Sequence, residues 1–349
     1  MRRNFSVSIN MKKLKLPRVI SGTSLLGNLY KEMSHEDKKA IVKEYIEACT
    51  GQPMFDSAGK YGAGLALEEL GLCLEELDIH PDEVLISNKL AWVRKPLTTP
   101  EPTFEKGIWH HLKYDADQKI SYRGLMECFE NGHELLGRYR SRLASVHDPD
   151  EYLAAAPNET AYKKRYDDIL EAYRALGDLK KNGDIIGIGI GAKDWRSIEK
   201  IAKDVHLDWV MIANSFTIYQ HPPELVELIE TLRRQDITII NSAVFHGGFL
   251  TGSNFFNYIE LNRTNPSHEK YYSWRDRFYA ICKTYNIEPP AAAIYFGLHV
   301  PGVQSIALNS SNAKRVRHNI EMAQAEIPTS FWKKMKDEGL IDPNYPHLG

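Results

Sequence analysis

Short runs of β-branched and aliphatic residues alternate with segments of helical periodicity along the whole chain. This alternation predicts parallel strands joined by helical crossovers, because each strand must return across the sheet through a covering helix. The eight runs that have the composition of buried strands are residues 18–22, 54–57, 84–88, 142–147, 185–190, 209–214, 237–242 and 303–308. Eight parallel strands close a barrel, so we predict a (β/α)8 TIM barrel.

Capping signals and apolar stripes mark two of the helices between these runs. Ser34 with Asp37 three residues later is typical of a helix N-terminus, and Gly51 would end that helix. Its apolar stripe consists of Ile41, Tyr45 and Cys49. A second stripe consists of Leu67, Leu70, Leu74 and Leu77. Both stripes have the spacing of a helix that packs on a barrel wall, so we interpret them as core.

The chain contains no internal repeat, low-complexity tract or linker, so we predict a single domain over residues 1–349. Two connections are unusually long: residues 90–120 follow the third strand and residues 253–272 follow the seventh. Long connections in compact domains are often functional, and both follow strand C-termini, where barrel enzymes place their active sites. We therefore expect a substrate-pocket wall and a flap over a cofactor.

The composition is that of a globular protein and narrows the classes of partner. Hydrophobic residues make up 43% and charged residues 26%, which excludes a disordered or fibrous chain. Lys and Arg number 44 against 46 Asp and Glu, so no general field attracts nucleic acid or an anionic membrane. We expect small-molecule partners, while the oligomeric state stays open.

The cysteines and the chain termini indicate the compartment. Four cysteines lie far apart without CxxC or zinc spacing, and we interpret them as buried, reduced thiols. They are Cys49, Cys73, Cys128 and Cys282. No stretch resembles a signal peptide or a membrane span, so the expected location is the cytoplasm.

Four ionisable residues follow or end consecutive predicted strands. They are Asp56, Tyr61, Lys89 and His147. Because the C-terminal ends of parallel barrel strands converge on one mouth, we expect these side chains to lie close together. Their chemistry suits proton transfer: a phenol with an ordinary pKa of about 10 is a poor base, and the Lys89 ammonium would lower the pKa of Tyr61.

The other two residues complete this hypothesis. Asp56 would compensate the charge of Lys89 and fix its position, and a neutral His147 would donate a hydrogen bond to the substrate oxygen. Each residue also has a purely structural interpretation: Asp56 as a turn cap, Tyr61 as turn packing, Lys89 as a solvated loop residue and His147 beside Asp148 as a capped core imidazole. Their joint order at successive strand ends favours catalysis.

Several segments resemble the aldo-keto reductases. The segments FDSAGKYGAG, ISNKLAW and VHDPD carry the likeness, and the C-terminal SIALNSSNAKRVRHNIE is similar to that family's adenine- and phosphate-binding segment. The resemblance implies a (β/α)8 fold, NAD or NADP as cofactor and an Asp–Tyr–Lys–His tetrad. It makes Tyr61 the general acid/base, Lys89 the modulator of its pKa, Asp56 the partner of Lys89 and His147 the group that orients the substrate.

The cofactor site follows partly from physical chemistry and partly from the resemblance. Ser310 and Ser311 precede a predicted helix N-terminus, where anions bind favourably, and Arg315 lies one turn further on. The resemblance implies additional contacts to the adenine, the nicotinamide and its ribose. The residues implied, in that order, are Asn319, Phe245 and Thr23. Phe245 could equally be ordinary core packing.

This sequence departs from the family pattern at three positions. Asn309 stands where many NADPH-preferring members have a lysine, so NAD is slightly favoured, although Arg315 remains. Lys193 or a small neighbour replaces the asparagine that holds the carboxamide. Asn214 is our interpretation of the other amide-binding position.

The fifth predicted strand contains a second, competing motif. Residues 187–192 fit the Rossmann pattern GxGxxG/A, and Asp208 lies near the offset of a ribose-binding acid. Asp208 opens the next strand, however, whereas a Rossmann acid ends one. We therefore interpret the glycines as making room inside a barrel. The adjacent His110 and His111 lack carboxylates at ligand spacing, so we predict no metal.

Within the family, the chain is most similar to the sugar-oxidising branch, the L-fucose or D-threo-aldose 1-dehydrogenases. The similar segments are LPRVISGTSLLGNLY, SVHDPDEYL, HGGFLTG and IPTSFWKKMKDEGLI. The resemblance implies oxidation of an aldose at C1 to the lactone. Trp92 and Trp109 in the long third loop would suit a sugar face, or they could pack locally.

Two other functions stay open, and the sequence disfavours a third. A reductase of aldehydes or ketones would use NADPH and the same four residues. A cofactor-binding regulatory subunit, such as the potassium-channel β subunits that resemble this family, would lack turnover. A metal-dependent sugar isomerase or hydrolase would need a carboxylate pair or ligand cluster at the mouth, and the sequence offers none.

Overall fold

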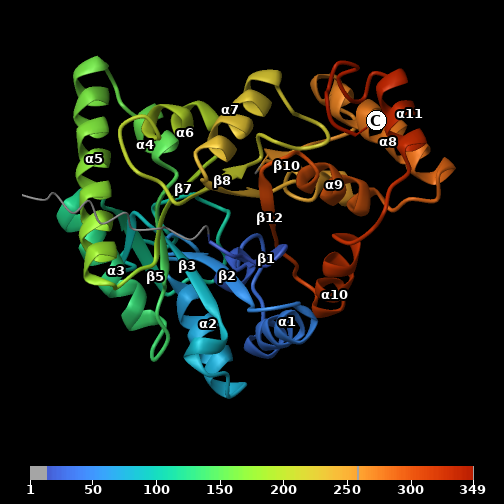
Figure 1. Ribbon diagram of the computed structural model, residues 1–349. Helices are drawn as coiled ribbons and strands as arrows, with labels where there is room; N and C mark the ends of the chain where they lie inside the picture. The colour runs from blue at the N-terminus through green and yellow to red at the C-terminus, as the bar shows by residue number, and fades with distance from the viewer. Residues whose placement is uncertain (1–13, 258, 349) are drawn as a thin grey trace, which may run out of the picture.

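Eight parallel strands form a closed barrel surrounded by helices in the computed structural model, which describes residues 14–257 and 259–348 (Figure 1). The order around the ring is β1-β12-β9-β8-β7-β6-β3-β2. The strands are β1 Val19–Gly22, β2 Met54–Ala58, β3 Leu85–Leu90, β6 Leu143–His147, β7 Gly187–Ala192, β8 Trp209–Ala213, β9 Thr238–Ser242 and β12 Val303–Leu308. Each overlaps a predicted run, so the predicted (β/α)8 barrel is confirmed.

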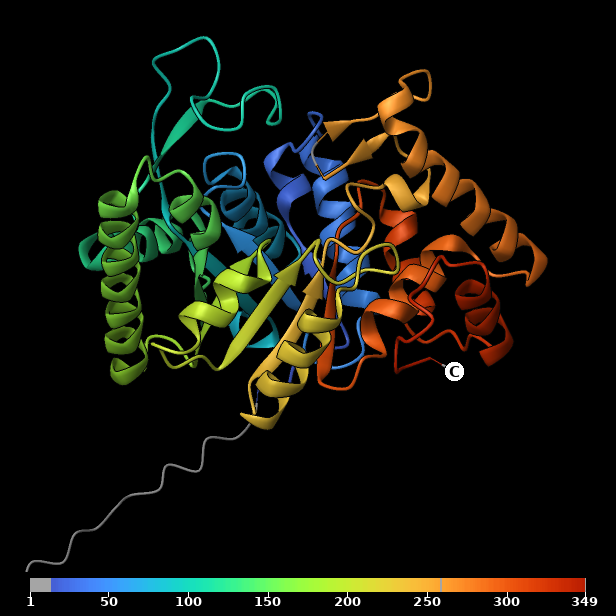
Figure 2. The same cartoon turned by 90° about the horizontal axis from the view of Figure 1, so that it is seen from above.

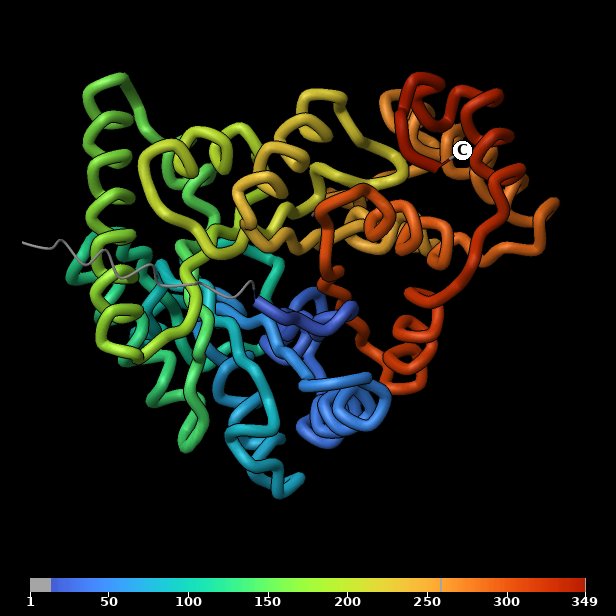
Figure 3. Tube along the Cα trace, viewed as in Figure 1, coloured from blue at the N-terminus to red at the C-terminus, as the bar shows by residue number. Residues whose placement is uncertain are grey.

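The helices follow the strands around the ring. Their bounds are α1 His35–Ala48, α2 Leu65–Glu76, α3 Tyr122–Leu135, α4 Pro149–Ala154, α5 Glu159–Asn182, α6 Trp195–Ile201, α7 Pro223–Arg234, α8 Glu269–Thr284, α9 Pro289–Leu298, α10 Ala313–Met322 and α11 Thr329–Asp337. The chain runs once around the ring, and β1 closes it by pairing with β12, as the trace in Figure 3 shows. The expectation of no signal peptide concerns an opening segment that lies largely outside the described residues.

The two long connections contain hairpins. The first holds β4 (Trp92–Pro96) antiparallel to β5 (Tyr114–Gln118), and the second holds β10 (Phe255–Phe256) antiparallel to β11 (Ile259–Glu260). Figure 2 shows both hairpins, teal and orange, projecting from the same side of the barrel. Both follow the C-terminal ends of barrel strands, so they border the face where a barrel active site opens.

Side chains from most of the strands fill the floor of the barrel. The buried cluster consists of Ile20, Met54, Leu85, Leu143, Trp209, Met211, Ile240 and Ala307, with Leu14 and Leu16 packed against it. Strand β7 contributes a glycine to this layer: a Cβ on Gly189 would lie 2.1 Å from the Trp209 indole. The glycines of β7 therefore make room for large neighbours inside the barrel, as predicted.

The Rossmann interpretation of β7 fails in the structure as it did on sequence grounds. Residues Gly187–Ala192 form a barrel strand between β6 and β8. Asp208 lies at the opposite end of the strands, where it accepts hydrogen bonds from Lys180 Nζ (2.6 Å) and the Ile188 backbone N–H (2.7 Å). Its carboxylate therefore anchors strand and helix ends, and Asp208 is not among the residues that line the cavity.

The first helix begins as predicted and ends earlier than predicted. Ser34 caps α1 by accepting a hydrogen bond from the Asp37 backbone N–H at 3.1 Å. The helix ends at Ala48, because Cys49 adopts extended backbone angles two residues before Gly51. Cys49 is half-buried, so its predicted burial is wrong, whereas the other three cysteines are buried as expected and all four are free thiols.

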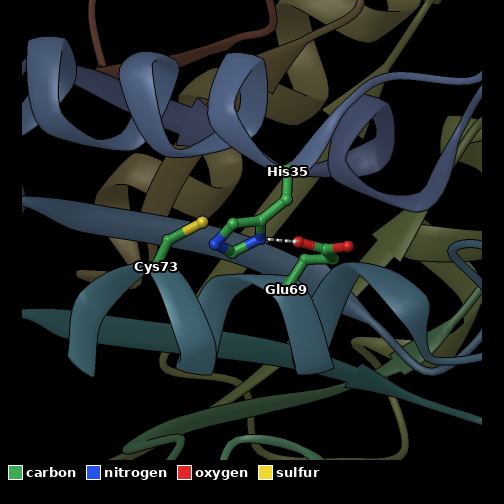
Figure 4. Close-up of side chains that lie close together, drawn as sticks. All are labelled: His35, Glu69 and Cys73. Atoms are coloured by element: carbon green, nitrogen blue, oxygen red, sulfur yellow. Dashed lines mark hydrogen bonds and ion pairs between the residues drawn. The ribbon is translucent and has the colours of Figure 1, made fainter. Parts of the chain in front are cut away.

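An ion-pair network joins α1 to α2 on the outside of the barrel (Figure 4). His35 Nδ1 lies 2.7 Å from Glu69 Oε2 and His35 Nε2 lies 3.1 Å from Glu76 Oε1. His35, Glu69 and Cys73 have the side-chain types of a metal site, with ligand atoms within 4.8 Å. Lys38 already neutralises Glu69 at 3.1 Å, and burial raises the pKa of the Cys73 thiol to about 12. This cluster therefore functions as a helix-to-helix ion-pair network.

Within the described residues, no helix has both the length and the apolar character that crossing a bilayer requires.

The fit of Gly189 against Trp209 predicts a large cost for one added methyl group. Gly189→Ala should lower the free energy of unfolding by about 1–3 kcal/mol through overpacking of the barrel floor, measured by urea denaturation. Gly177→Ala is the matched control, because this glycine lies exposed in α5 with nothing within 4 Å of an added Cβ. An equal effect of the two substitutions would contradict the packing account.

The His35 network predicts a pH-dependent contribution to stability. The hydrogen bond to Glu69 is the main cause that raises the pKa of His35 above 6.5. A raised pKa in the folded state stabilises the protein below the ordinary pKa, and this stabilisation is lost as pH rises through the folded-state pKa. His35→Gln should therefore destabilise by up to about 1 kcal/mol at about pH 5.5 and by less at about pH 8.5. If the free energies of unfolding of the wild type and His35→Gln differed by the same amount at both pH values, the ion-pair role would be disproved.

Candidate active site

The ends of β2, β3 and β6 bring the four predicted catalytic residues to one cavity. Asp56 and Lys89 belong to neighbouring strands, His147 ends the next strand along the ring, and Tyr61 follows β2 in a turn. All four line a cavity of about 640 Å³ that opens at the C-terminal end of the barrel. Its size is typical of sites for small molecules and cofactors.

A buried ion pair forms the floor of this site. The Lys89 ammonium donates a short hydrogen bond to Asp56 Oδ2, and both residues are only 3% exposed. Lys89 Nζ also lies 4.8 Å from the centroid of the Tyr61 ring. The predicted partnership of Asp56 with Lys89 is thus present, and it places a compensated cation against the phenol ring.

The pKa of Tyr61 differs from the sequence-based expectation. Burial raises the pKa well above 10, and the negative charges of Asp56 and Asp148 raise it further, while Lys193 and Lys60 lower it. The predicted lowering by Lys89 is therefore wrong for the protein without bound ligands. The main physical reason is burial, which disfavours the charged phenolate, and the negative charge of Asp56 adds to this effect.

His147 presents a neutral imidazole to the cavity. Its ring meets the Tyr61 ring edge-to-face with centroids 5.6 Å apart, and its Nε2 lies 3.6 Å from Asp148 Oδ2. Burial lowers the pKa of His147 well below 6.5, and the nearby cations of Lys89 and Lys60 lower it further. The neutral state agrees with the sequence-based expectation and leaves an N–H available for a substrate oxygen.

Two glycines fix the turn that carries Tyr61. Gly62 has a φ of +60°, and a Cβ there would lie 2.4 Å from the Gly27 carbonyl oxygen. A Cβ on Gly27 would in turn lie 2.8 Å from the Tyr61 backbone. This close approach between the β1 and β2 loops requires glycine on both sides and holds the phenol over the barrel mouth.

The remaining predicted cofactor residues line the same cavity, away from Tyr61. They are Thr23, Asn214, Phe245, Asn309, Ser310, Ser311, Arg315 and Asn319. Thr23 Oγ1 donates a hydrogen bond to the Asp56 carbonyl oxygen at 3.0 Å, and Asn309 Nδ2 donates one to Ser24 Oγ at 2.6 Å. The cavity therefore runs from the catalytic residues to α10.

The α10 end of the cavity combines a helix N-terminus with polar side chains. Asn312 caps the helix by accepting a hydrogen bond from the Lys314 backbone N–H at 3.0 Å, and Ser310 precedes it in the same turn. Arg315 is exposed, and its side chain has no hydrogen-bond or ion-pair partner among residues 14–257 and 259–348. A helix N-terminus with an available guanidinium suits phosphate groups.

One predicted substrate residue lies elsewhere. Trp92 is not among the residues that line the cavity; its ring packs 5.4 Å from Phe104 within the β4–β5 hairpin region. Lys60 Nζ lies 5.5 Å from the centroid of the same ring, so the lining of the cavity does not support the expected sugar contact of Trp92. Trp109 does line the cavity, and its ring centroid lies 5.9 Å from that of Tyr61.

The structure adds a charged cluster beside the catalytic residues. It consists of Lys60, Glu105, Asp148, Glu151 and Lys193. Burial alone would lower the pKa of Lys60, but Asp148, Glu105 and Glu151 raise it, so Lys60 is a cation. The Lys193 ammonium pairs with Asp148 at 3.4 Å and also with Glu151. These ion pairs engage the side chain that stands at the family's carboxamide-binding position.

Sequence signals for this cluster differ among its members. Lys60 and Asp148 are direct neighbours of Tyr61 and His147, so adjacency could have indicated them. Glu105 lies within the long loop without any motif, and only the folded loop brings it to Lys60.

The arrangement can transfer a proton between a substrate oxygen and Tyr61 while the neutral His147 donates a hydrogen bond to that oxygen. The cavity is lined both by these side chains and by residues at the N-terminal end of α10, where hydroxyl and guanidinium groups would suit the phosphates of a nicotinamide dinucleotide.

Comparison with known proteins agrees with this geometry. The profile of the Aldo/keto reductase family matches residues 18–338. Pyridoxal 4-dehydrogenase of Microbacterium luteolum is 27% identical over 340 residues, covering 92% of this chain and 93% of that protein. D-threo-aldose 1-dehydrogenase of a Pseudomonas species is 25% identical over 344 residues, covering 94% and 95%.

Solved structures share the fold. A glycerol dehydrogenase from Gluconobacter oxydans superposes with a TM-score of 0.69 at 16% identity, covering 96% of this chain and 95% of that one. An aldo-keto reductase from Bacillus halodurans, in its holo form, gives a TM-score of 0.66 at 17% identity, covering 93% and 92%. The family profile and the dehydrogenase relatives identify an NAD(P)-dependent oxidoreductase. The chain belongs to the aldo/keto reductase family.

Proposed function

We propose that this enzyme oxidises C1 of an aldose, such as L-fucose or a D-threo-aldose, to the lactone. The observation that carries the proposal is the common cavity of Tyr61, His147 and the Lys89–Asp56 pair, which Trp109 lines on the substrate side. The nicotinamide cofactor, when bound along the cavity, supplies the hydride acceptor. A D-threo-aldose 1-dehydrogenase among the relatives supports the substrate class.

The side chains have defined roles in this reaction. The C1 hydroxyl loses its proton to the Tyr61 oxygen, the C1–H bond supplies the hydride, and a C1=O bond forms. His147 donates a hydrogen bond to the reacting oxygen and orients it. The Lys89–Asp56 pair holds the phenol in place and keeps a compensated charge beneath it. Proton removal and substrate orientation thus belong to separate groups.

The substrate class fits a cyclic hemiacetal. An aldose and pyridoxal each carry an aldehyde with a hydroxyl group within reach, so both can close to a ring whose oxidation gives a lactone. The two dehydrogenase relatives are named for these compounds. Pyridoxal therefore belongs in the substrate panel beside the aldoses.

The raised pKa of Tyr61 favours a second candidate, an NADPH-dependent reductase of aldehydes or ketones. A phenol that stays protonated at neutral pH is a general acid, which reduction requires. The same four residues would serve both directions. The two candidates are separated by comparing turnover with NAD and L-fucose to turnover with NADPH and a simple aldehyde.

We also propose NAD as the slightly preferred cofactor and the cytoplasm as the location. Asn309 is neutral and bonds Ser24, so it offers no cation to a 2′-phosphate, while Arg315 offers one. The free cysteines support a reducing compartment.

The first experiment replaces the proton-transfer group. Tyr61→Phe should lower kcat for aldose oxidation by at least about a hundredfold, the usual contribution of general acid–base catalysis. Wild-type oxidation should accelerate as pH rises towards the raised pKa of Tyr61, because only the phenolate accepts a proton. Reduced-cofactor absorbance measures both effects. Near-normal turnover by Tyr61→Phe would remove Tyr61 from the mechanism.

The second experiment tests the cofactor proposal through α10. Arg315→Ala should lower kcat/KM for NADP about tenfold through loss of a charge-assisted contact, and should change kcat/KM for NAD by less than about twofold. Arg317→Ala is the matched control, because Arg317 in the same helix is paired with Glu44 at 2.6 Å and does not line the cavity. Equal losses for NADP and NAD would contradict a role at the 2′-phosphate.

A further inference from the structure

Lys60 is a buried cation at the substrate side of the cavity that the proposed reaction does not use. Its residue is 3% exposed, although it lines the cavity beside Tyr61. Its ammonium lies 2.7 Å from Glu105 Oε1, 3.0 Å from Glu151 Oε2 and 3.5 Å from Asp148 Oδ2. Glu151 and Asp148 belong to the segment after β6, whereas Glu105 comes from the long loop. Lys60 therefore ties the long loop to the barrel.

Glu105 extends this contact to the wall of the cavity. While its Oε1 faces Lys60, its Oε2 accepts a hydrogen bond from Trp109 Nε1 at 2.7 Å. Glu105 also adopts a φ of +42°, in the left-handed region that disfavours residues with a side chain. Such backbone strain persists where surrounding contacts hold it and is frequent at ligand-binding positions. One carboxylate oxygen of Glu105 thus pairs with Lys60, and the other accepts the hydrogen bond that holds Trp109.

Backbone contacts fix the other side of Trp109. Its backbone forms a β-bridge with Leu29, and the neighbouring Ile108 carbonyl accepts a hydrogen bond from the Tyr30 N–H at 2.8 Å. Trp109 is 7% exposed, and its ring lies at 32° to the Tyr61 ring. The indole is therefore held as a fixed apolar surface next to the proton-transfer group.

We infer that the Lys60–Glu105 ion pair determines substrate specificity by holding Trp109 as the wall against which a ring-shaped polyhydroxy substrate packs. This inference rests on the proposed function and adds a positioning role for two residues outside the catalytic four. A flat indole matches the C–H face of a pyranose, whereas a short open-chain aldehyde reaches only the reacting groups. Loss of the ion pair should therefore weaken the binding of ring substrates more than that of open-chain substrates.

The central test is Glu105→Gln, which keeps an acceptor for Trp109 Nε1 and removes the charge that pairs with Lys60. KM for the ring substrate should rise about tenfold while kcat changes by less than about twofold, because uniform binding is lost. Both constants for propanal reduction should stay within about twofold of the wild type. Glu101→Gln, an exposed carboxylate in the same loop, is the matched control and should leave both substrates unchanged.

A double-mutant cycle tests whether Glu105 acts through Lys60. Lys60→Met should lower the ratio of kcat/KM for the ring substrate to kcat/KM for propanal, as Glu105→Gln does. The double variant Lys60→Met/Glu105→Gln should lower this ratio no further than Lys60→Met alone. Thermal unfolding of each variant identifies any general loss of structure. Three results would overturn the inference. They are additive losses of selectivity in the double variant, an equal loss of kcat/KM for ring and open-chain substrates, and an effect of Glu101→Gln equal to that of Glu105→Gln.

The failure of the proposed function can be distinguished from the failure of this inference. If the wild type reduces aldehydes but oxidises neither aldoses nor pyridoxal, the proposed function fails. The ratio of kcat/KM for cyclohexanecarbaldehyde to that for propanal then reports the selectivity. A drop of about tenfold in this ratio in Glu105→Gln supports the inference, and an unchanged ratio overturns it.

Discussion

The buried ion pair between Lys89 and Asp56 is the interaction on which the site depends. Two opposite charges out of water are tolerated only when they are paired closely, and the removal of either one leaves an uncompensated charge in the barrel. The pair spans neighbouring strands, so the barrel itself fixes it. Tyr61 lies over this pair, and its pKa is raised first by burial and then by the negative charge of Asp56.

The barrel strands and the loops contribute different parts of the site. The apolar floor around Trp209 closes one end of the barrel, so the cavity opens at the other end, where the strand termini present their polar residues. The β1 and β2 loops meet through glycines and hold Tyr61, while the long loop brings Trp109 against it. Catalytic groups thus come from rigid strand ends, and the surface that meets the substrate comes from a loop held by charge.

The sequence predicts the barrel and the catalytic set because both depend on local patterns. Aliphatic runs indicate the strands, and the convergence of strand ends brings Asp56, Lys89 and His147 together without knowledge of the loops. The direction of the Tyr61 pKa could not be predicted, since it depends first on how deeply the folded chain buries the phenol and then on the charges of Asp56 and Asp148 around it. Trp92 and Glu105 lie in a loop whose hairpin decides which side chains face the cavity, and no periodicity reveals that choice.

The central claim is that the charge of Asp56, held in place by Lys89, raises the pKa of Tyr61 in addition to the effect of burial. It is tested most directly by the pH dependence of kcat/KM for aldehyde reduction in the wild type and in Asp56→Asn, with circular dichroism to verify folding. Removal of the carboxylate removes a negative charge that raises the pKa of Tyr61, so the alkaline limb of the profile should move to lower pH in the variant. A folded variant with an alkaline limb at the wild-type position would contradict the account.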